Sequence, residues 1–229
     1  MKRFWWILVV VVAVAGVAYG VERGVTSSTT TTSVASTTSS VATTSSVPDS
    51  AWTAVWPRAQ SAAYATPAAA ARAFATQFLS MRAPVLGSFQ RGDSRSGEVA
   101  VTPYHGGPVT TVLVRQLTSS NAWWVLGAST HDITIQQPRA LSTVGTTFVI
   151  SGQSTAYEAV VKVSLWSDQV STPVLRTTVM GGSMGVMGHF QKTLKVVGHP
   201  GLATLVMYVI SAKDGSVVAA STARFRLGS

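Results

Sequence analysis

The sequence predicts two folded units of different class, an α+β unit over residues 51–132 and an all-β immunoglobulin-like sandwich over residues 133–229. The first unit combines one amphipathic helical stretch with short extended runs. The second contains about seven short extended runs with turn signals between them, which is typical of an immunoglobulin-like sandwich. A transmembrane helix within residues 1–25 and a disordered linker, residues 26–50, are expected to precede both units.

The chain begins with Lys2 and Arg3, followed by an apolar run over residues 4–21. A run of about 18 apolar residues is just long enough to cross a bilayer. Because basic residues stay on the cytoplasmic side, we expect a single-pass anchor in the cell membrane with the C-terminal units extracytoplasmic. The alternative is a signal peptide cleaved after the small residues Ala18 and Gly20, which would leave a secreted protein.

The linker, residues 26–50, is dominated by Ser and Thr. Such a composition lacks the apolar side chains needed to bury a core, so we expect it to be disordered. It is either an O-glycosylated stalk or an unmodified flexible tether. In both cases it would hold the folded units away from the membrane.

In residues 51–132, Thr66 and Pro67 predict the start of a helix, with Thr66 as the N-cap and Pro67 at the first helical position. Apolar residues then recur at helical spacing and predict one buried face, made of Ala70, Phe74, Phe78 and Met81. Turn-rich segments separate four expected strands, at 85–89, 98–102, 110–117 and 123–128. A helix packed on these strands would bury its apolar face.

In residues 133–229, the expected strands lie near 133–137, 146–151, 156–166, 173–180, 188–197, 203–212 and 216–227. The segment "KDGS", residues 213–216, predicts a hairpin turn before the last strand. Alternation in that strand predicts an apolar face of Val217, Ala219, Ala223, Phe225 and Leu227, and an opposite, outward face with Thr222, Arg224 and Arg226. The chain has no cysteine, so no disulfide crosses the sandwich.

A carboxylate, Glu158, interrupts the apolar run "FVISGQSTAYEAVVKVSLW" at residues 148–166. In a strand that starts at Ala156, Glu158 and Lys162 would share the outward face while Tyr157 would point inward. We therefore expect Glu158 to be a solvated surface residue and not a catalytic acid.

The net charge of +9 is spread along the chain without a basic cluster. A diffuse excess favours weak attraction to anionic surfaces, such as phospholipid headgroups or acidic wall polymers. It argues against nucleic acid, whose binders usually show a basic stripe within a recognisable module. Without cysteine, and with four histidines that lack metal-ligand spacing, the sequence predicts no metal site and no cofactor.

The segment "GGSMG", residues 181–185, matches G-x-S-x-G with Ser183 at the nucleophile position. That chemistry needs a strand before the serine and a helix after it. The residues that follow, "VMGHFQKTLKV", predict a strand, so we interpret the segment as a glycine-rich loop between strands. A serine hydrolase that uses Ser183 stays as an alternative.

Trp123 and Trp124 are the candidate ligand or interface aromatics. Neighbouring residues on a strand point to opposite faces, so one of the two belongs to the core. The other either packs at the interface between the units or is exposed and stacks on a sugar ring. The units are connected by only a few residues, 129–134, so we expect them to pack against each other and to unfold together.

Three segments of the second unit resemble the immunoglobulin-like domain of bacterial spore germination proteins: "ITIQQPRALSTVGTTFVISGQSTAYEAVVKVSLW", "GHFQKTLKV" and "GLATLVMYVISAKDGSVVAASTARFRL". The resemblance covers about residues 133–227 and lies in the strand ending at Pro138, the "YEAVVKV" strand, Phe190 and the closing "DGS" hairpin. That family has no established catalytic residues and accompanies other exported envelope domains, so the resemblance implies a scaffold or interaction role. The first unit is similar to N-terminal units of actinobacterial membrane-anchored envelope proteins, which implies no function of its own.

Together, these patterns predict a non-catalytic, membrane-tethered cell-envelope protein that binds or scaffolds wall material or another envelope protein. The expected partners are the membrane, through residues 4–21, and an anionic cell-wall polymer or an envelope protein. One alternative is a carbohydrate-binding module that uses an exposed Trp, and the other is the serine hydrolase.

Overall fold

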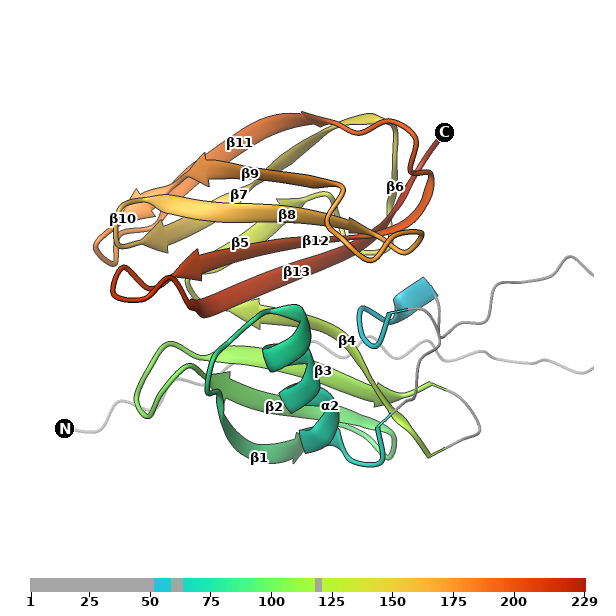
Figure 1. Ribbon diagram of the computed structural model, residues 1–229, viewed down its shortest axis with the longest axis vertical. Helices are drawn as coiled ribbons and strands as arrows, with labels where there is room; N and C mark the ends of the chain where they lie inside the picture. The colour runs from blue at the N-terminus through green and yellow to red at the C-terminus, as the bar shows by residue number, and fades with distance from the viewer. Residues whose placement is uncertain (1–51, 59–63, 118–120) are drawn as a thin grey trace, which may run out of the picture. The chain divides into compact units, whose positions relative to one another are not determined.

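The computed structural model describes residues 52–58, 64–117 and 121–229 (Figure 1). All of them fall within a compact unit formed by residues 44–229. The predicted transmembrane segment, residues 1–25, and the linker, residues 26–50, lie outside the described residues. In the part of the chain that is described, no helix is both long and apolar enough to cross a membrane.

Helix α2, Pro67–Ala73, begins where the capping residues predict. The Thr66 side chain accepts a hydrogen bond from the backbone nitrogen of Ala69 at 3.1 Å, which satisfies a donor at the helix start. The helix continues as a π-helical turn, η1, Phe74–Phe78. The predicted apolar face is confirmed, because Ala70, Phe74, Phe78 and Met81 are all buried.

Helix α2 packs on an antiparallel sheet whose strands follow one another in chain order. These strands are β1 Val85–Arg91, β2 Ser96–Thr102, β3 Thr110–Gln116 and β4 Trp123–Thr130. All four predicted strands are therefore present. Val99, Val101 and Val112 are fully buried in the core beneath the helix, as alternation in β2 and β3 requires.

The C-terminal half, residues 133–229, contains strands and turns but no helix, every residue of it being described. Its strands are β5 Ile133–Gln137, β6 Thr143–Val144, β7 Thr147–Ala156, β8 Val160–Ser167, β9 Leu175–Met180, β10 Gly182–Ser183, β11 Gly188–Lys195, β12 Gly201–Ile210 and β13 Val217–Leu227. All seven predicted strands are confirmed. Strands β6 and β10 are not predicted, because two residues are too few to show alternation.

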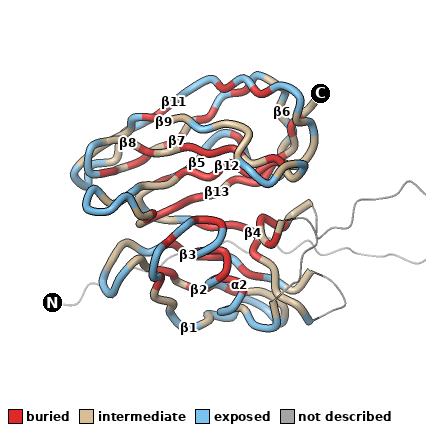
Figure 2. The backbone as a smooth tube through the Cα atoms, viewed as in Figure 1, coloured by how far each residue is buried: buried red, intermediate tan, exposed pale blue. Residues whose placement is uncertain are grey.

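The strands of this half form two layers. One layer contains β5, β7, β10 and β11, and the other is a five-stranded sheet in the order β6-β13-β12-β8-β9 (Figure 1). Between them lies a core that includes Ile150, Leu165, Leu205 and Phe225. Figure 2 shows buried stretches, in red, along the strands of both layers. The described residues are thus mostly β-sheet with one short helix, consistent with an immunoglobulin-like sandwich.

The two halves pack together, as the short connection predicts. Strand β4 continues into β5 within one eight-stranded sheet through the pairing of Thr130 with Ile133. The core under the helix also contains Val206 and Ala220, which lie on the outer face of the five-stranded sheet. Hydrogen bonds add to this contact, since the Thr222 side chain accepts one from the backbone of Ala128 at 2.9 Å.

Strand β13 corrects one prediction about exposure. The face that carries Thr222 and Arg224 was expected to point outward, but Arg224 is only 4% exposed and Thr222 is half-buried. The reason is that this face is covered by other parts of the fold, including β4. Val217 was expected on the apolar face that packs into the core of the sandwich. A register shift opposite Val209 and Ile210 places it instead in the core under the helix.

The position of Glu158 corrects another prediction. Strand β7 runs unbroken to Ala156, and residues 157–159 form the turn to β8, with Ala159 at a φ of 61°. Glu158 is exposed, as predicted, but in a turn and not on a strand. Tyr157, which was expected to point inward, is 67% exposed for the same reason.

Strand β7 continues through Gly152, where the sequence predicted a break between the strands at 146–151 and 156–166. A side-chain carbon at this position would lie 1.9 Å from the backbone oxygen of Thr134 on β5. The glycine is therefore required by the close approach of two strands. The predicted "KDGS" hairpin is confirmed, with Gly215 at a φ of 70° between β12 and β13.

Candidate ligand-binding cleft

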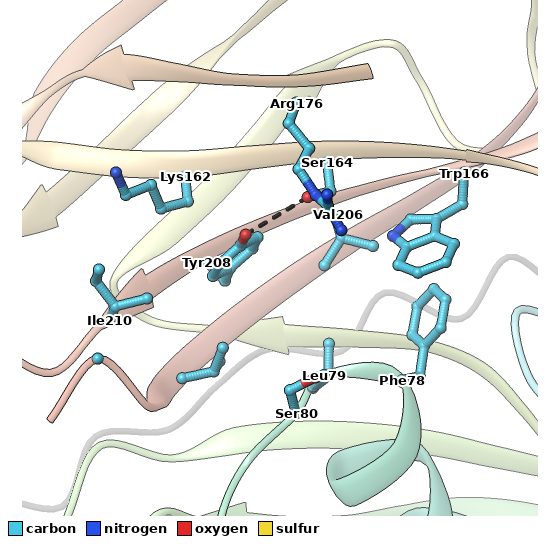
Figure 3. Close-up of a pocket in the computed structure, with 12 residues that line it drawn as sticks. Phe78, Leu79, Ser80, Lys162, Ser164, Trp166, Arg176, Val206, Tyr208 and Ile210 are labelled. Atoms are coloured by element: carbon cyan, nitrogen blue, oxygen red, sulfur yellow. Dashed lines mark hydrogen bonds between the residues drawn. The ribbon is translucent and has the colours of Figure 1, made fainter. Parts of the chain in front are cut away.

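A cleft of about 300 Å³ opens where the helical segment ends above the outer face of the five-stranded sheet (Figure 3). Phe78, at the end of the helical segment, and the following residues Leu79 and Ser80 form one side. The sheet contributes the other side, with Lys162, Ser164, Trp166, Arg176, Val206, Tyr208, Ile210 and Val217, and the turn adds Gly215. The cleft therefore exists only where the two halves meet.

Two basic side chains, Lys162 and Arg176, line this cleft. Ser164 on β8 pairs directly with Arg176 on β9, and Lys162 is two residues from Ser164. Lys162 and Arg176 are thus diagonal neighbours on one face of the sheet, within reach of each other's long side chains. Neither forms an ion pair with a carboxylate of the described residues, and no Asp or Glu lines the cleft.

The cleft also contains two hydroxyl groups, and the backbone at its helical side has an unusual conformation. The hydroxyls of Ser164 and Tyr208 lie 3.5 Å apart, and Ser164 is only 4% exposed. On the helical side, the π-helical turn η1 ends next to Ser80, which has a φ of 62°. π-Helical turns and positive φ values at residues other than glycine both recur at functional sites.

The Trp166 side of the cleft is held in place by two residues of the N-terminal half. The Phe78 ring lies 5.2 Å from the Trp166 ring, measured between centroids. The guanidinium carbon of Arg58 lies over the same Trp166 ring, 4.8 Å from its centroid. Trp166 is therefore positioned by two elements that precede the sandwich in the chain.

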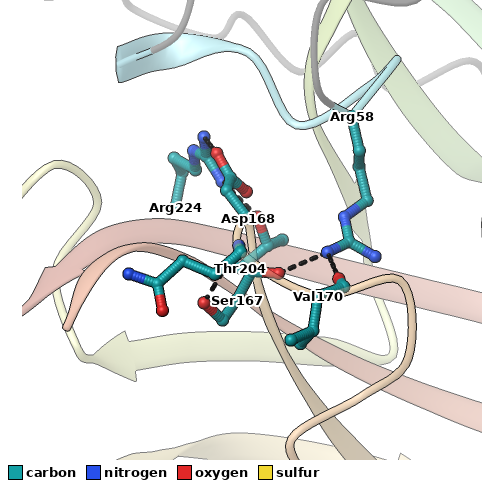
Figure 4. A network of polar contacts seen from close by, with 7 residues as sticks. Arg58, Ser167, Asp168, Val170, Thr204 and Arg224 are labelled. Carbon is teal, nitrogen blue, oxygen red and sulfur yellow. Dashed lines mark hydrogen bonds and ion pairs between the residues drawn. The ribbon is translucent and has the colours of Figure 1, made fainter. Parts of the chain in front are cut away.

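Arg58 also reaches the backbone of the sandwich. It donates hydrogen bonds to the carbonyl oxygens of Ser167 and Val170 (Figure 4). Burial lowers the pKa of the Arg58 guanidinium from its ordinary value, and the nearby Asp168 carboxylate opposes this effect. Asp168 is itself paired with the buried Arg224. These contacts form a polar network that joins residue 58 to the edge of the cleft.

Trp123 and Trp124 lie at the start of β4, and both are half-buried. The Trp123 ring packs edge-on against Phe89, with 5.3 Å between centroids, and borders the core under the helix. The indole nitrogen of Trp124 is buried without a hydrogen-bond partner among the described residues. Neither residue lines the cleft in Figure 3, and their role as ligand or interface aromatics stays a prediction.

Ser183 lies in β10, which pairs in parallel with the end of β7. The chain then turns at Met184 and Gly185, both with positive φ values, and enters β11 and not a helix. His189, the histidine nearest in sequence, has its Nε2 atom 3.4 Å from the Gln153 side chain. The strand predicted after the segment is present, but Gly182 and Ser183 themselves form the short strand β10 and not a loop. The strand–turn–helix context of a serine nucleophile is not formed.

The described side chains do not suit a metal ion. Across residues 52–58, 64–117 and 121–229, no group of three or more His, Asp or Glu side chains is placed to hold a metal ion. The cleft itself offers cationic, hydroxyl and aromatic groups. These groups suit an anionic ligand better than a cation.

The two-layer arrangement of short antiparallel strands agrees with a comparison with known families. Residues 132–216 match the immunoglobulin-like domain of bacterial spore germination. The match begins next to β5 and ends just before β13, and it confirms the predicted resemblance. An immunoglobulin-like germination domain suggests a non-catalytic binding or scaffolding role, since the family is not known as catalytic. No curated protein and no solved structure matches the chain.

Sequence reasoning missed the cleft. It placed Lys162 on the solvent side of β8 together with Glu158, and it gave Arg176 and Tyr208 no role. One signal was available, because alternate positions of β8 hold Lys162, Ser164 and Trp166 in place of the aliphatic residues of the opposite face. A polar and aromatic face of this kind indicates a surface that differs from the aliphatic core face, but not which element covers it.

Proposed function

We propose that the chain is a non-catalytic, membrane-tethered protein of the bacterial cell envelope, and that its immunoglobulin-like germination domain binds an anionic wall polymer. The observation that carries this proposal is a group of basic residues on β8, β9 and β11, namely Lys162, Arg176, Lys192 and Lys195. We call this group the basic edge. None of these three strands contains an Asp or a Glu.

One residue of the basic edge, Lys192, spans the opening between the two layers. The Lys192 side chain on β11 donates hydrogen bonds to Thr177 Oγ1 at 2.6 Å and to the Thr178 carbonyl at 3.1 Å, both on β9. Because Arg176 and Thr177 are consecutive residues of β9, their side chains point to opposite faces, and Lys192 and Arg176 lie on the two sides of this strand. Cationic side chains along adjacent strands attract an extended polyanion at several points.

Wall binding is the first prediction. We expect residues 44–229 to cosediment with purified cell wall at low salt, and binding to weaken as salt screens the charges. Replacing all four residues of the basic edge with Gln should abolish cosedimentation. The matched control replaces four exposed basic residues elsewhere, Arg72, Arg91, Arg139 and Lys213, and removes the same charge. Equal loss in both variants, or no binding of the unmodified protein, would refute the proposal.

The membrane tether is a separate part of the proposal. Lys2 and Arg3 precede the apolar run 4–21, and the Ser/Thr-rich linker follows it. We therefore expect protease added to intact, wall-stripped cells to digest the folded halves. Complete protection of these halves in intact cells, with digestion after lysis, would show that the topology is wrong.

A further inference from the structure

We propose that the cleft between the helical segment and β8, β9 and β12 binds one acidic sugar ring, through a carboxylate or phosphate group held by Lys162 and Arg176. This inference rests on the proposed function and names the part of an anionic polymer that the protein recognises. It concerns the cleft, whereas the other two residues of the basic edge, Lys192 and Lys195, do not line it.

The charge of the cleft is the first argument. Lys162 and Arg176 are diagonal neighbours of the same sign, and like charges at this separation repel each other. The C-terminal end of the helix contributes only about half a negative charge, so the cleft stays positive. The nearest acid along the turn, Asp214, accepts hydrogen bonds from the backbone and side chain of Ser216. An oxyanion between the two cations would remove their repulsion.

The remaining groups of the cleft suit a sugar ring. Tyr208 and Trp166 provide aromatic surface, and the hydroxyls of Ser164 and Tyr208 can donate or accept hydrogen bonds. The volume of about 300 Å³ is at the lower limit for small-molecule sites. This size admits a single ring with its acidic group and not a long stretch of polymer.

Because both halves line the cleft, binding is coupled to their association. Ser80 and Leu79 come from the helical side, while Lys162 and Arg176 come from the sandwich. A ligand that binds only the assembled cleft stabilises the folded state by mass action. Binding should therefore raise the unfolding temperature of the whole unit.

The experiment follows the Trp166 indole N–H resonance of residues 44–229 by NMR, assigned with Trp166→Phe, during titration with glucuronate, glucose 6-phosphate and glucose. We expect the two acidic sugars to shift this resonance and to raise the unfolding temperature, whereas neutral glucose does neither. The variant K162Q/R176Q should bind at least about tenfold more weakly, since charge-assisted hydrogen bonds are lost. Arg139→Gln, which removes an exposed cation that belongs neither to the cleft nor to the basic edge, should bind as the unmodified protein does.

The outcomes separate this inference from the proposed function. A response to glucuronate alone or to glucose 6-phosphate alone supports the inference and identifies the acidic group. Equal affinity for glucose, or unchanged affinity in K162Q/R176Q with a native circular dichroism spectrum, overturns it. If wall cosedimentation persists while no acidic sugar binds the cleft, the proposed function stands and the inference fails.

Discussion

Replacing Phe78 with alanine is expected to lower the free energy of unfolding by about 4 kcal/mol. Phe78 is 7% exposed and lies within ring-stacking distance of Trp56, Phe74 and Trp166, with centroid separations of 5.6, 5.4 and 5.2 Å. Trp166 belongs to the sandwich, so the substitution opens a cavity in the contact between the halves. Urea denaturation monitored by circular dichroism measures the change.

The control for this variant is Tyr157→Ala. It removes an aromatic ring that is 67% exposed in the turn between β7 and β8. We expect a change within about 0.5 kcal/mol, because exposed side chains away from special features contribute little. If Phe78→Ala and Tyr157→Ala had equal effects, the Phe78 ring would not be packed as the structure shows.

Replacing Asp168 with asparagine is expected to lower the free energy of unfolding by about 3 kcal/mol at neutral pH. Arg224 is 4% exposed, and its two terminal nitrogens donate to the Asp168 carboxylate at 2.7 and 2.5 Å. Without the carboxylate, a buried guanidinium keeps the hydrogen bond to Thr204 but loses its counter-charge. The value lies at the lower end of the range for buried pairs, because the Asp168 side chain is 30% exposed and water can partly replace it.

Two further variants define the origin of this effect. Arg82→Gln breaks an exposed ion pair with Asp214, in which the Arg82 side chain is 72% exposed, and should change stability little. The double variant D168N/R224M should recover part of the loss, since an apolar side chain carries no charge to be left unpaired. A double variant no more stable than D168N would show that the loss comes from packing and not from the buried charge.

The parts of the fold that depend on local chemistry could be predicted from the sequence. The Thr66 cap and the helical spacing of Phe74 and Phe78 determine a helix start and its buried face, and both depend on neighbouring residues alone. The strands could be predicted for a similar reason, because the alternation of apolar and polar residues is also a local pattern. The turn at residues 157–159 was missed because Gly152 looks like a turn residue but is needed for the close approach of β5.

The contact between the two halves, and the cleft that it forms, depend on residues that are far apart in the sequence. Such contacts leave no local pattern in the sequence. Arg224 looks like an outward residue of an alternating strand until Asp168, 56 positions earlier, is placed beside it. The cleft combines the end of the helical segment with Lys162, Arg176 and Tyr208 from three strands. The net charge of +9 favours an anionic partner, in line with the ligand proposed above.

The central claim is that the two halves form one folded unit and that their junction holds the ligand-binding cleft. The division into two domains at residues 132 and 133 stays a prediction, and differential scanning calorimetry of residues 44–229 tests how far the halves are independent. We predict a single transition whose calorimetric and van't Hoff enthalpies have a ratio of about 1. Two separated transitions, each reproduced by one isolated half, would contradict the account, because a cleft built from both halves requires that they fold together.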